Sequence, residues 1–243
     1  MKLAGVLVTI APVLGKEKAV ELLLPLFVRL LKDEIPDVRM SVVPSLGTLN
    51  EVIGSDLIAQ QIIPEIATLA DDPQWRVRLA VCEQIPGLAG SLGQTVFNDK
   101  LKALVLAWLE DNVFSIRSNA SVCIAKLCKV LGAGWVTSSL LPKLTSMANN
   151  KDSETYLSRL TALFLMQSCA ETMDKDNVNK GALPIVLKLC KDPVANIRFN
   201  AARALELMAP KLASKDVKST LDAMLKDSDI DVQYYSKQAL AAL

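Results

Sequence analysis

The chain has 243 residues, of which 51% are hydrophobic and only 5% aromatic, so its apolar residues are mainly Leu, Ile, Val and Ala. These residues pack helix against helix and indicate an all-α fold. The 27 Lys and Arg residues nearly balance the 26 Asp and Glu residues, and the net charge of +1 excludes a general attraction to nucleic acid or to an anionic membrane.

Histidine is absent from the sequence, which removes the commonest general base and the commonest metal ligand. No two of the five cysteines are spaced as C-x-x-C, and all stand in apolar helical stretches: Cys82, Cys123, Cys128, Cys169 and Cys190. We therefore expect buried reduced thiols instead of a disulfide framework or a zinc site. No metal, cofactor or catalytic site is expected.

The first element, Leu3–Leu14, is apolar and follows Lys2, as in a secretory signal peptide. It is too short to span a bilayer, and it contains Pro12. A glycine ends it, and a glycine ends three later apolar helices at intervals of 39 residues: Gly15, Gly54, Gly93 and Gly132. The segment is therefore interpreted as the second helix of a repeat whose first helix is missing, in a fragment of a longer repeat protein.

Two further markers share this period. One is a proline, with Ala103 in the slot that a 39-residue step predicts: Pro25, Pro64, Pro142 and Pro184. The other is an Asp followed six residues later by Arg: Asp33 with Arg39, Asp72 with Arg78, Asp111 with Arg117, and Asp192 with Arg198. Helix pairs of this length are typical of HEAT-repeat solenoids, so we expect a right-handed α-α superhelix.

The first complete repeat predicts two helices, A and B. Apolar residues at helical spacing predict helix A up to residue 32, and Asp33–Pro36 forms a turn because proline suits the first position of a helix. Helix B is expected over about 37–53, with the left-handed conformation at Gly54 as its C-cap. Prolines inside two B helices predict kinks at Pro44 and Pro86.

The markers divide the chain into half a repeat and a series of helix pairs. Residues 1–15 are helix B of a truncated repeat, 16–54, 55–93, 94–132, 133–174 and 175–213 are five helix pairs, and 214–243 is a C-terminal pair. The fourth pair is longer, because 42 residues separate Arg117 from Arg159, and the extra length falls in an elongated turn over 148–153. The last pair keeps Asp227 but has Gln233 in place of the arginine.

The periodic Asp and Arg residues are expected to form a ladder of hydrogen bonds between neighbouring repeats. The alternative is a row of solvated charges, in which each pair contributes about 0–1 kcal/mol. We favour the ladder because a regular stack shares each charge between two neighbours. It would comprise Asp33, Arg39, Asp72, Arg78, Asp111, Arg117, Asp192 and Arg198.

Four strings resemble the scaffolding A subunit of protein phosphatase 2A, in particular its C-terminal part: Leu22–Phe27, Trp75–Ala80, Ala107–Leu109 and Asp192–Asn200. The resemblance runs along essentially the whole chain. It implies a non-catalytic scaffold whose A–B turns hold the catalytic subunit of protein phosphatase 2A. It also implies that regulatory B-type subunits bind the full-length protein, and that the protein is cytoplasmic and also nuclear.

Carried over by position, the resemblance implies catalytic-subunit contacts at Trp75, Arg76, Phe114, Tyr156, Arg159, Val194, Ala195 and Ile230. Trp75 stands out by itself, since it is a large aromatic in a mostly polar turn. Successive turns would present an apolar ridge, which is typical of a partner surface. The alternative is packing beneath the neighbouring repeat, which stays open for Phe114 and Tyr156 and is favoured for Trp108 and Trp135.

Two other functions are weighed against the phosphatase scaffold. A HEAT-repeat adaptor or transport receptor would bind other proteins on its concave face, but the B helices show no regularly spaced acidic or Asn-rich positions. An enzyme is disfavoured, because the sequence has no histidine, no Gly-rich phosphate loop and no clustered cysteines or paired carboxylates outside the turns.

Overall fold

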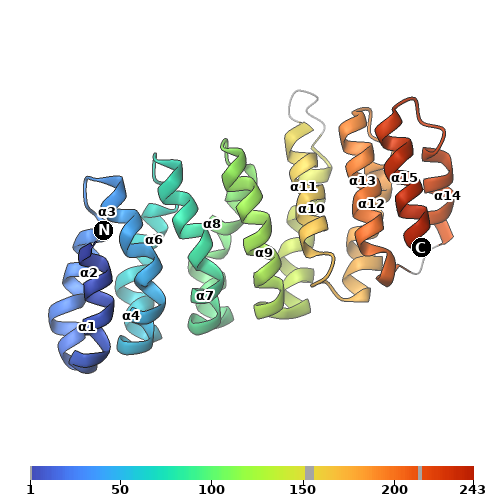
Figure 1. Ribbon diagram of the computed structural model, residues 1–243. Coiled ribbons are helices and arrows are strands. Elements are labelled where there is room, and N and C mark those ends of the chain that lie inside the picture. The colour runs from blue at the N-terminus through green and yellow to red at the C-terminus, as the bar shows by residue number, and fades with distance from the viewer. Residues whose placement is uncertain (1, 151–155, 213–214) are drawn as a thin grey trace. The chain divides into compact units, whose positions relative to one another are not determined.

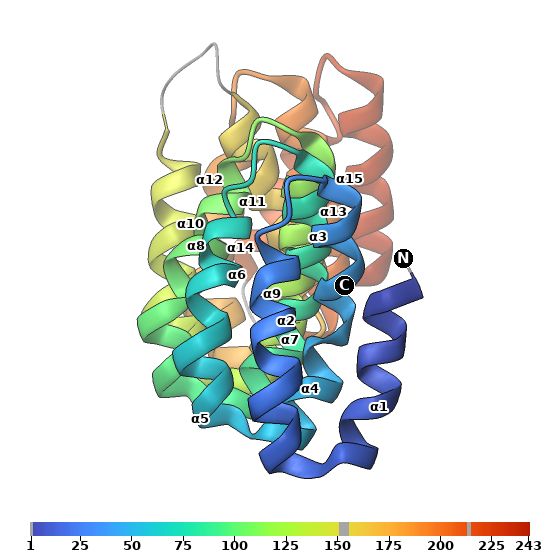
Figure 2. The same cartoon turned by 90° about the vertical axis from the view of Figure 1, so that its left-hand side faces the viewer.

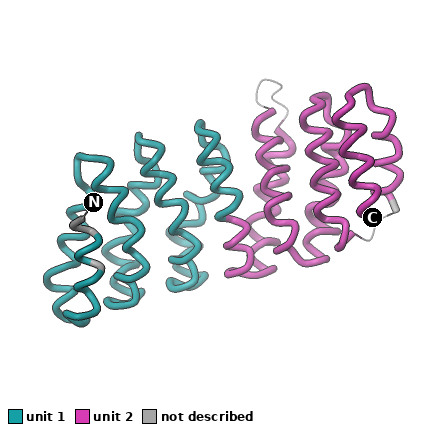
Figure 3. Tube along the Cα trace, in the orientation of Figure 1, with its two compact units in different colours: residues 1–123 teal, residues 124–243 magenta. Residues whose placement is uncertain are grey.

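A computed structural model of the protein describes residues 2–150, 156–212 and 215–243 (Figure 1). Every regular element in these ranges is a helix, which confirms the all-α prediction. The chain divides into two compact units, residues 1–123 and 124–243 (Figure 3).

Unit 1 alternates between A and B helices in two layers. Its elements are α1 (Lys2–Lys18), η1 (Ala19–Leu23), α2 (Leu24–Leu31), α3 (Pro36–Val42), η2 (Val43–Ser45), α4 (Leu46–Ile53), α5 (Ser55–Leu57), η3 (Ile58–Ile62), α6 (Ile63–Leu69), α7 (Trp75–Lys100), α8 (Lys102–Ala107), η4 (Trp108–Glu110) and the start of α9 (Phe114–Trp135). The A helix α2 packs on α6, and α3 and α4 pack on the B-helix part of α7. Figure 2 shows α6 and α8 in one layer and α3 and α4 in the other.

Unit 2 has the same alternation. After the end of α9 come η5 (Val136–Leu140), α10 (Leu141–Ala148), α11 (Tyr156–Cys169), η6 (Asn177–Ala182), α12 (Leu183–Leu189), α13 (Ala195–Met208), η7 (Ala209–Lys211), α14 (Lys215–Met224) and α15 (Ile230–Ala242). The B helices stack in the order α11, α13, α15, and the A helix α10 packs on α12. Each A helix also packs on the B helix that follows it. Residues 151–153 of the elongated turn predicted over 148–153 lie outside the described residues.

Glycine makes the joint between each early B helix and the next A helix. The described residues with positive φ are Gly15 (74°), Gly54 (91°), Gly93 (80°) and Gly132 (78°), with ψ of 171°, 158°, 162° and 179°. The left-handed helical C-cap predicted at Gly54 is therefore wrong: φ is positive as expected, but ψ is extended instead of helical. An extended ψ with a positive φ belongs to a region that is essentially restricted to glycine, and it turns the chain into the next helix within one residue.

The periodic prolines follow π-helical turns. The residue before each proline donates its N–H five residues back: Leu24 to Ala19 O, Ile63 to Ile58 O, Leu141 to Val136 O, and Leu183 to Val178 O. Proline has no N–H and its ring clashes with the carbonyl four residues earlier, and a π turn relieves that clash without ending the helix. Where Ala103 replaces the proline, the helix has no π turn but a break at Leu101.

The two prolines inside B helices behave differently. Pro44 lies in the 3-10 turn η2, which separates α3 from α4, as the predicted kink requires. Pro86 lies inside α7, where the non-helical backbone angles fall at Gly93 instead. The break in that helix is therefore set by the glycine joint.

The core lies between the two layers of each unit. Trp108 and Trp135 are buried, as predicted, and the Trp108 indole Nε1–H donates to the carbonyl of Ala70 in the preceding repeat at 2.9 Å. All five cysteines are buried, also as predicted. The stretch Phe114–Ala148 is long and apolar enough to cross a membrane, but the glycine joint at Gly132 interrupts it, and core helices of globular proteins meet the same criterion.

Candidate functional site

The turns that join helix A to helix B lie at one end of the helices in each unit, at the top of Figure 1. We call them the A–B edge. In unit 1 the edge comprises residues 32–35, 70–74 and 111–113, and in unit 2 its described parts are residues 149–150, 190–194 and 225–229, each followed by the first residue of a B helix. The sequence-predicted site residues lie on this edge or within one helical turn of it.

An aspartate closes each of five turns along the edge. Its carboxylate accepts the backbone N–H two residues further on, an Asx-type turn that fixes the backbone ahead of helix B. Ile35 N–H donates to Asp33 at 2.9 Å, Gln74 to Asp72 at 2.8 Å, Val113 to Asp111 at 2.8 Å, Val194 to Asp192 at 2.9 Å, and Asp229 to Asp227 at 2.9 Å. The turn chemistry is therefore the same in both units.

The arginine six residues later ties helix B to the same turn. Its guanidinium donates to the aspartate's backbone carbonyl: Arg39 to Asp33 at 2.7 Å, Arg78 to Asp72 at 2.7 Å, Arg117 to Asp111 at 2.7 Å, and Arg198 to Asp192 at 3.0 Å. In the last pair Gln233 Nε2 donates to the Asp227 carbonyl at 2.6 Å. Glutamine thus keeps the turn-closing bond of the arginine that it replaces.

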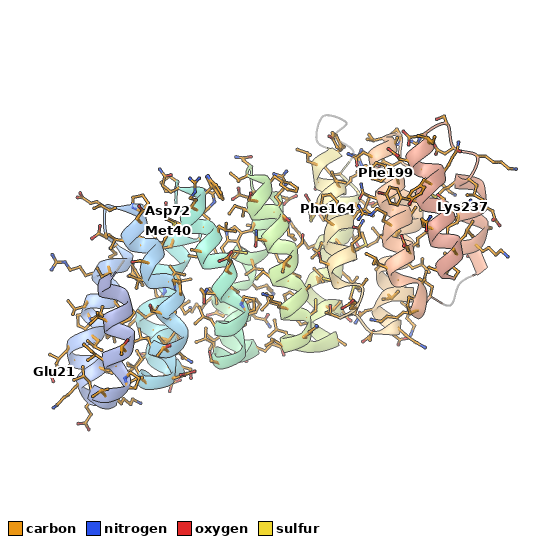
Figure 4. All side chains as sticks on the ribbon, viewed as in Figure 1. Glu21, Met40, Asp72, Phe164, Phe199 and Lys237 are labelled. Carbon is orange, nitrogen blue, oxygen red and sulfur yellow. The ribbon has the colours of Figure 1, made fainter. Side chains whose placement is uncertain are left out.

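A guanidinium at the same repeat position pairs with the aspartate carboxylate of the following repeat. Arg39 lies 2.8 Å from Asp72, Arg78 2.9 Å from Asp111, Arg159 2.7 Å from Asp192, and Arg198 2.7 Å from Asp227. Each of these arginines therefore joins its own turn to the next turn within its unit. Figure 4 shows Asp72 at the upper end of unit 1, where this pairing takes place.

The ion pairs are shielded from water, which strengthens them relative to exposed pairs. The side chains of Arg159 and Asp192 are each only 7% exposed. The Arg198 hydrogen bond lowers the pKa of Asp227, and the same bond raises the pKa of Arg198. Arg159, which the resemblance placed at a partner contact, donates to Asp192 and to the Asn150 carbonyl, so its guanidinium is engaged within the scaffold.

The B helices that follow the turns of the A–B edge all begin at an equivalent position. It lies three residues before the ladder arginine, or before Gln233 in the last pair. We call the residues at this position the N1 row: Pro36, Trp75 and Phe114 in unit 1, and Tyr156, Ala195 and Ile230 in unit 2. Phe114 is 60% exposed and Ile230 78% exposed, while Trp75, Tyr156 and Ala195 are half-buried. Phe114 therefore does not pack beneath the neighbouring repeat.

Three apolar residues stand directly before the N1 row, and one of them is the half-buried Val113, which sequence reasoning missed. Val194, which was predicted, is half-buried, and Ile35, which sequence reasoning missed, is 58% exposed. All three follow their turn aspartate by two residues and donate a backbone N–H to it. That shared spacing is the signal that could have identified Ile35 and Val113.

Arginines lie against two aromatic rings of the N1 row. The exposed Arg76 guanidinium is 4.6 Å from the centre of the Trp75 ring, and the Arg117 guanidinium is 5.7 Å from the centre of the Phe114 ring. A cation over a ring face orients both groups. Tryptophan and arginine are also the residue types that most often dominate binding energy at protein interfaces.

A hollow lies beneath the A–B edge in each unit. In unit 1 a cavity of about 580 Å³ is lined by Pro73, Leu104, Trp108 and the ladder residues Asp72, Arg78 and Asp111. In unit 2 one of about 630 Å³ is lined by Asn149, Leu187, Lys188, Pro193 and the ladder pair Arg159 and Asp192. The edge therefore offers both projecting side chains and recesses. Among the described residues, no group of His, Cys, Asp and Glu could hold a metal ion.

A family model described as PIK3R4-like, middle domain, matches residues 15–144, which is more than half of the chain. The chain belongs to this family. A HEAT-repeat model also matches residues 182–212, the range of α12, α13 and η7. The periodic helix pairs and these matches agree on a HEAT-type repeat protein.

Named relatives include phosphatase regulatory proteins. The chain is 33% identical over 126 residues to the regulatory A subunit of protein phosphatase PP2A from Saccharomyces cerevisiae, covering 48% of this chain and 20% of that protein. It is 23% identical over 241 residues to human serine/threonine-protein phosphatase 4 regulatory subunit 1, covering 93% of this chain and 25% of that protein. The chain thus spans only a fifth to a quarter of these relatives' length. Both relatives are regulatory subunits, in agreement with a non-catalytic role.

A solved structure of a Kap121p mutant aligns with a TM-score of 0.75 over 98% of this chain and 27% of that one, at 18% sequence identity. At this identity the similarity shows the fold alone. It supports the solenoid-type helix arrangement and carries no information on partners.

Proposed function

We propose that the chain is a non-catalytic part of a phosphatase-associated scaffold and that its A–B edge docks a phosphatase catalytic subunit. The observation that carries the proposal is the N1 row, which exposes Phe114 and Ile230 and leaves Trp75 only half-buried although these side chains are apolar. Exposing such side chains in equivalent places is unfavourable in water unless a partner covers them.

The ladder explains how a row of turns acts as a docking surface. A ladder arginine such as Arg78 binds its own turn and the next one, so neighbouring N1 side chains are held at a fixed spacing before a partner arrives. A surface ordered in advance loses less conformational entropy on binding. In this proposal Arg159 acts by fixing the position of the fourth turn, since its guanidinium already binds Asp192.

The two units contribute different contacts. In unit 1 the anchors are Trp75 with Arg76, and Phe114. In unit 2 Tyr156, Val194, Ala195 and Ile230 offer further, mostly smaller, apolar contacts. Binding of regulatory B-type subunits to the full-length protein and its cytoplasmic and nuclear location belong to the same proposal.

The test is binding of the purified chain to the isolated catalytic subunits of protein phosphatase 2A and protein phosphatase 4, measured by biolayer interferometry. Trp75→Ala is expected to weaken binding by about 30-fold, because truncating a central anchor costs about 2 kcal/mol. The matched control is Val130→Ala, which truncates a side chain that is 47% exposed on α9, away from the edge.

Equal binding of the Trp75→Ala variant and the wild-type chain, with unchanged helical content, would show that the A–B edge is not the docking site. Absence of binding to both catalytic subunits would instead favour the adaptor hypothesis. The comparison between the two phosphatases also decides which of them the chain serves, since its relatives include regulatory subunits of both.

A further inference from the structure

Two cysteines of unit 2 face each other inside the protein. The Sγ atoms of Cys128, on α9, and Cys169, the last residue of α11, are 3.9 Å apart. The two residues are 3% and 0% exposed, and they join successive B helices. At a rise of 1.5 Å per residue each lies about 20 Å along its helix from the N1 row. The pair is therefore separate from the proposed docking edge.

The pairing is not a feature of the repeat. Counted from the ladder arginine, Cys169 occupies the position that other B helices fill with a large buried side chain, namely Leu49, Leu88, Leu127 and Met208. Cys128 occupies the next position, which elsewhere holds Asn50, Ala89, Ala170 and Ala209. Two cysteines thus meet at one helix contact only among the described residues. Packing of helix on helix does not require them there.

The two thiols differ in their acidity. The hydrogen bond with Cys169 lowers the pKa of Cys128, burial acts against this shift, and a hydrogen bond from Thr172 lowers the pKa further. The hydrogen bond with Cys128 raises the pKa of Cys169, burial raises it further, and a hydrogen bond from Thr172 acts in the opposite direction. A cysteine with a stabilised thiolate next to a protonated one is the usual arrangement of an attacking and a resolving cysteine.

We propose that Cys128 and Cys169 form a reversible disulfide between α9 and α11 in response to a peroxide. The Cys128 thiolate attacks one oxygen of hydrogen peroxide, the O–O bond breaks, and with a proton the leaving hydroxide becomes water. The Cys169 sulfur then attacks the resulting sulfenic acid, an S–S bond forms, and a second water leaves. Two thiols are oxidised and one peroxide is reduced to two waters. A low-molecular-weight thiol such as glutathione reverses the bond by exchange.

The geometry allows this step with a small local movement. A disulfide requires the sulfurs to approach to about 2 Å, so they must close by roughly the same distance. Cys169 ends α11 and is followed by a turn over residues 170–174, and helix ends open more easily than helix interiors. Opening of this terminus also admits peroxide, which is about as small as water.

The other cysteines supply the contrast. Burial raises the pKa of Cys190 to about 12, which leaves it almost without thiolate at neutral pH. Cys190 and Cys82 have no sulfur partner among the described residues. Both are therefore expected to stay reduced while the Cys128 and Cys169 pair reacts.

The experiment treats the full chain with hydrogen peroxide, blocks the remaining thiols by alkylation and maps the peptides by mass spectrometry without reduction. The expected result is a peptide linking Cys128 to Cys169, with the loss of two hydrogens, which disappears on adding dithiothreitol. Cys128→Ser and Cys169→Ser should each abolish it, and Cys190→Ser should leave its yield unchanged.

Either of two outcomes would overturn the proposal. In one, the peroxide-treated chain has native circular dichroism and all five of its thiols are alkylated once denaturant exposes them. In the other, Cys128 is oxidised to sulfinic acid without a linked peptide, which would make it a damage site. The wild-type map decides the matter even if a serine variant folds poorly. As a second measurement, the melting temperature of the oxidised chain should exceed that of the reduced chain, because the bond closes a long loop.

Discussion

The glycine joints allow the sharpest test of backbone conformation in this chain, and Gly93 is the best site for that test. Its φ of 80° and ψ of 162° lie in the region that only glycine occupies readily, where another residue costs about 1–3 kcal/mol. A Cβ built on Gly93 would meet no atom within 4 Å, so the whole cost comes from the backbone. Gly93→Ala should therefore destabilise the chain by about 2 kcal/mol and lower the melting temperature by about 4–8 °C.

The matched control is Gly87→Ala, in the same helix α7. Gly87 is exposed, has no positive φ, and its added Cβ would also meet nothing within 4 Å. Alanine in a helix interior is favoured over glycine by about 0.5–1 kcal/mol, so this variant should be slightly more stable than the wild-type chain. Thermal and urea unfolding followed by circular dichroism measure both variants.

A third variant separates two conformations at Gly93. Asparagine tolerates the left-handed helical conformation, but not a positive φ combined with an extended ψ. Gly93→Asn should therefore be about as destabilising as Gly93→Ala. A clearly milder asparagine variant would mean that the joint is an ordinary left-handed cap, and equal stability of the two alanine variants would mean that the joint carries no backbone constraint.

Two further predictions concern the ladder. Asp192→Ala removes the carboxylate that faces the buried Arg159 and should lower the free energy of unfolding by about 3 kcal/mol more than Asp33→Ala does. The Asp33 carboxylate is the control, because it accepts a turn N–H but pairs with no arginine among the described residues. Urea unfolding measures the difference between the two variants. Because the folded-state pKa of Asp227 is lowered, the stability it contributes is present above its unfolded pKa of about 3.9 and is lost as the pH falls through the folded value. Asp227→Asn should be less stable than the wild-type chain at pH 6, and acid titrations should show the difference shrinking below about pH 4.

Much of the fold could be predicted because each sequence marker has a local physical cause. The joint glycines are required by a backbone conformation, and the periodic prolines by the π turns that precede them. Such causes act within one repeat, so spacing alone locates them. The value of ψ at Gly54 escaped prediction, because a glycine after a helix is compatible with more than one conformation.

Contacts between repeats could be predicted only in part: the sequence indicated a ladder between neighbouring repeats, but not which atoms of each arginine and aspartate pair within and between turns. The carboxylate partner of Arg39 is Asp72, 33 residues away, while the partner in its own turn is bound only through a carbonyl. A regular row of Asp and Arg is compatible with pairing inside a repeat or with pairing to a neighbour. The sulfur contact of Cys128 with Cys169 spans 41 residues and departs from the repeat pattern, so periodicity gave no indication of it.

The structure separates the residues that hold the turns from the residues proposed to bind a partner. Aspartate and arginine recur because each makes the same bonds in successive turns. The N1 position lies between them and makes no ladder bond, and its occupants range from proline and alanine to tryptophan. Substitutions at N1 are therefore expected to change binding with little loss of stability, whereas ladder substitutions should reduce both. The turn can thus be kept constant while the surface it presents changes along the chain.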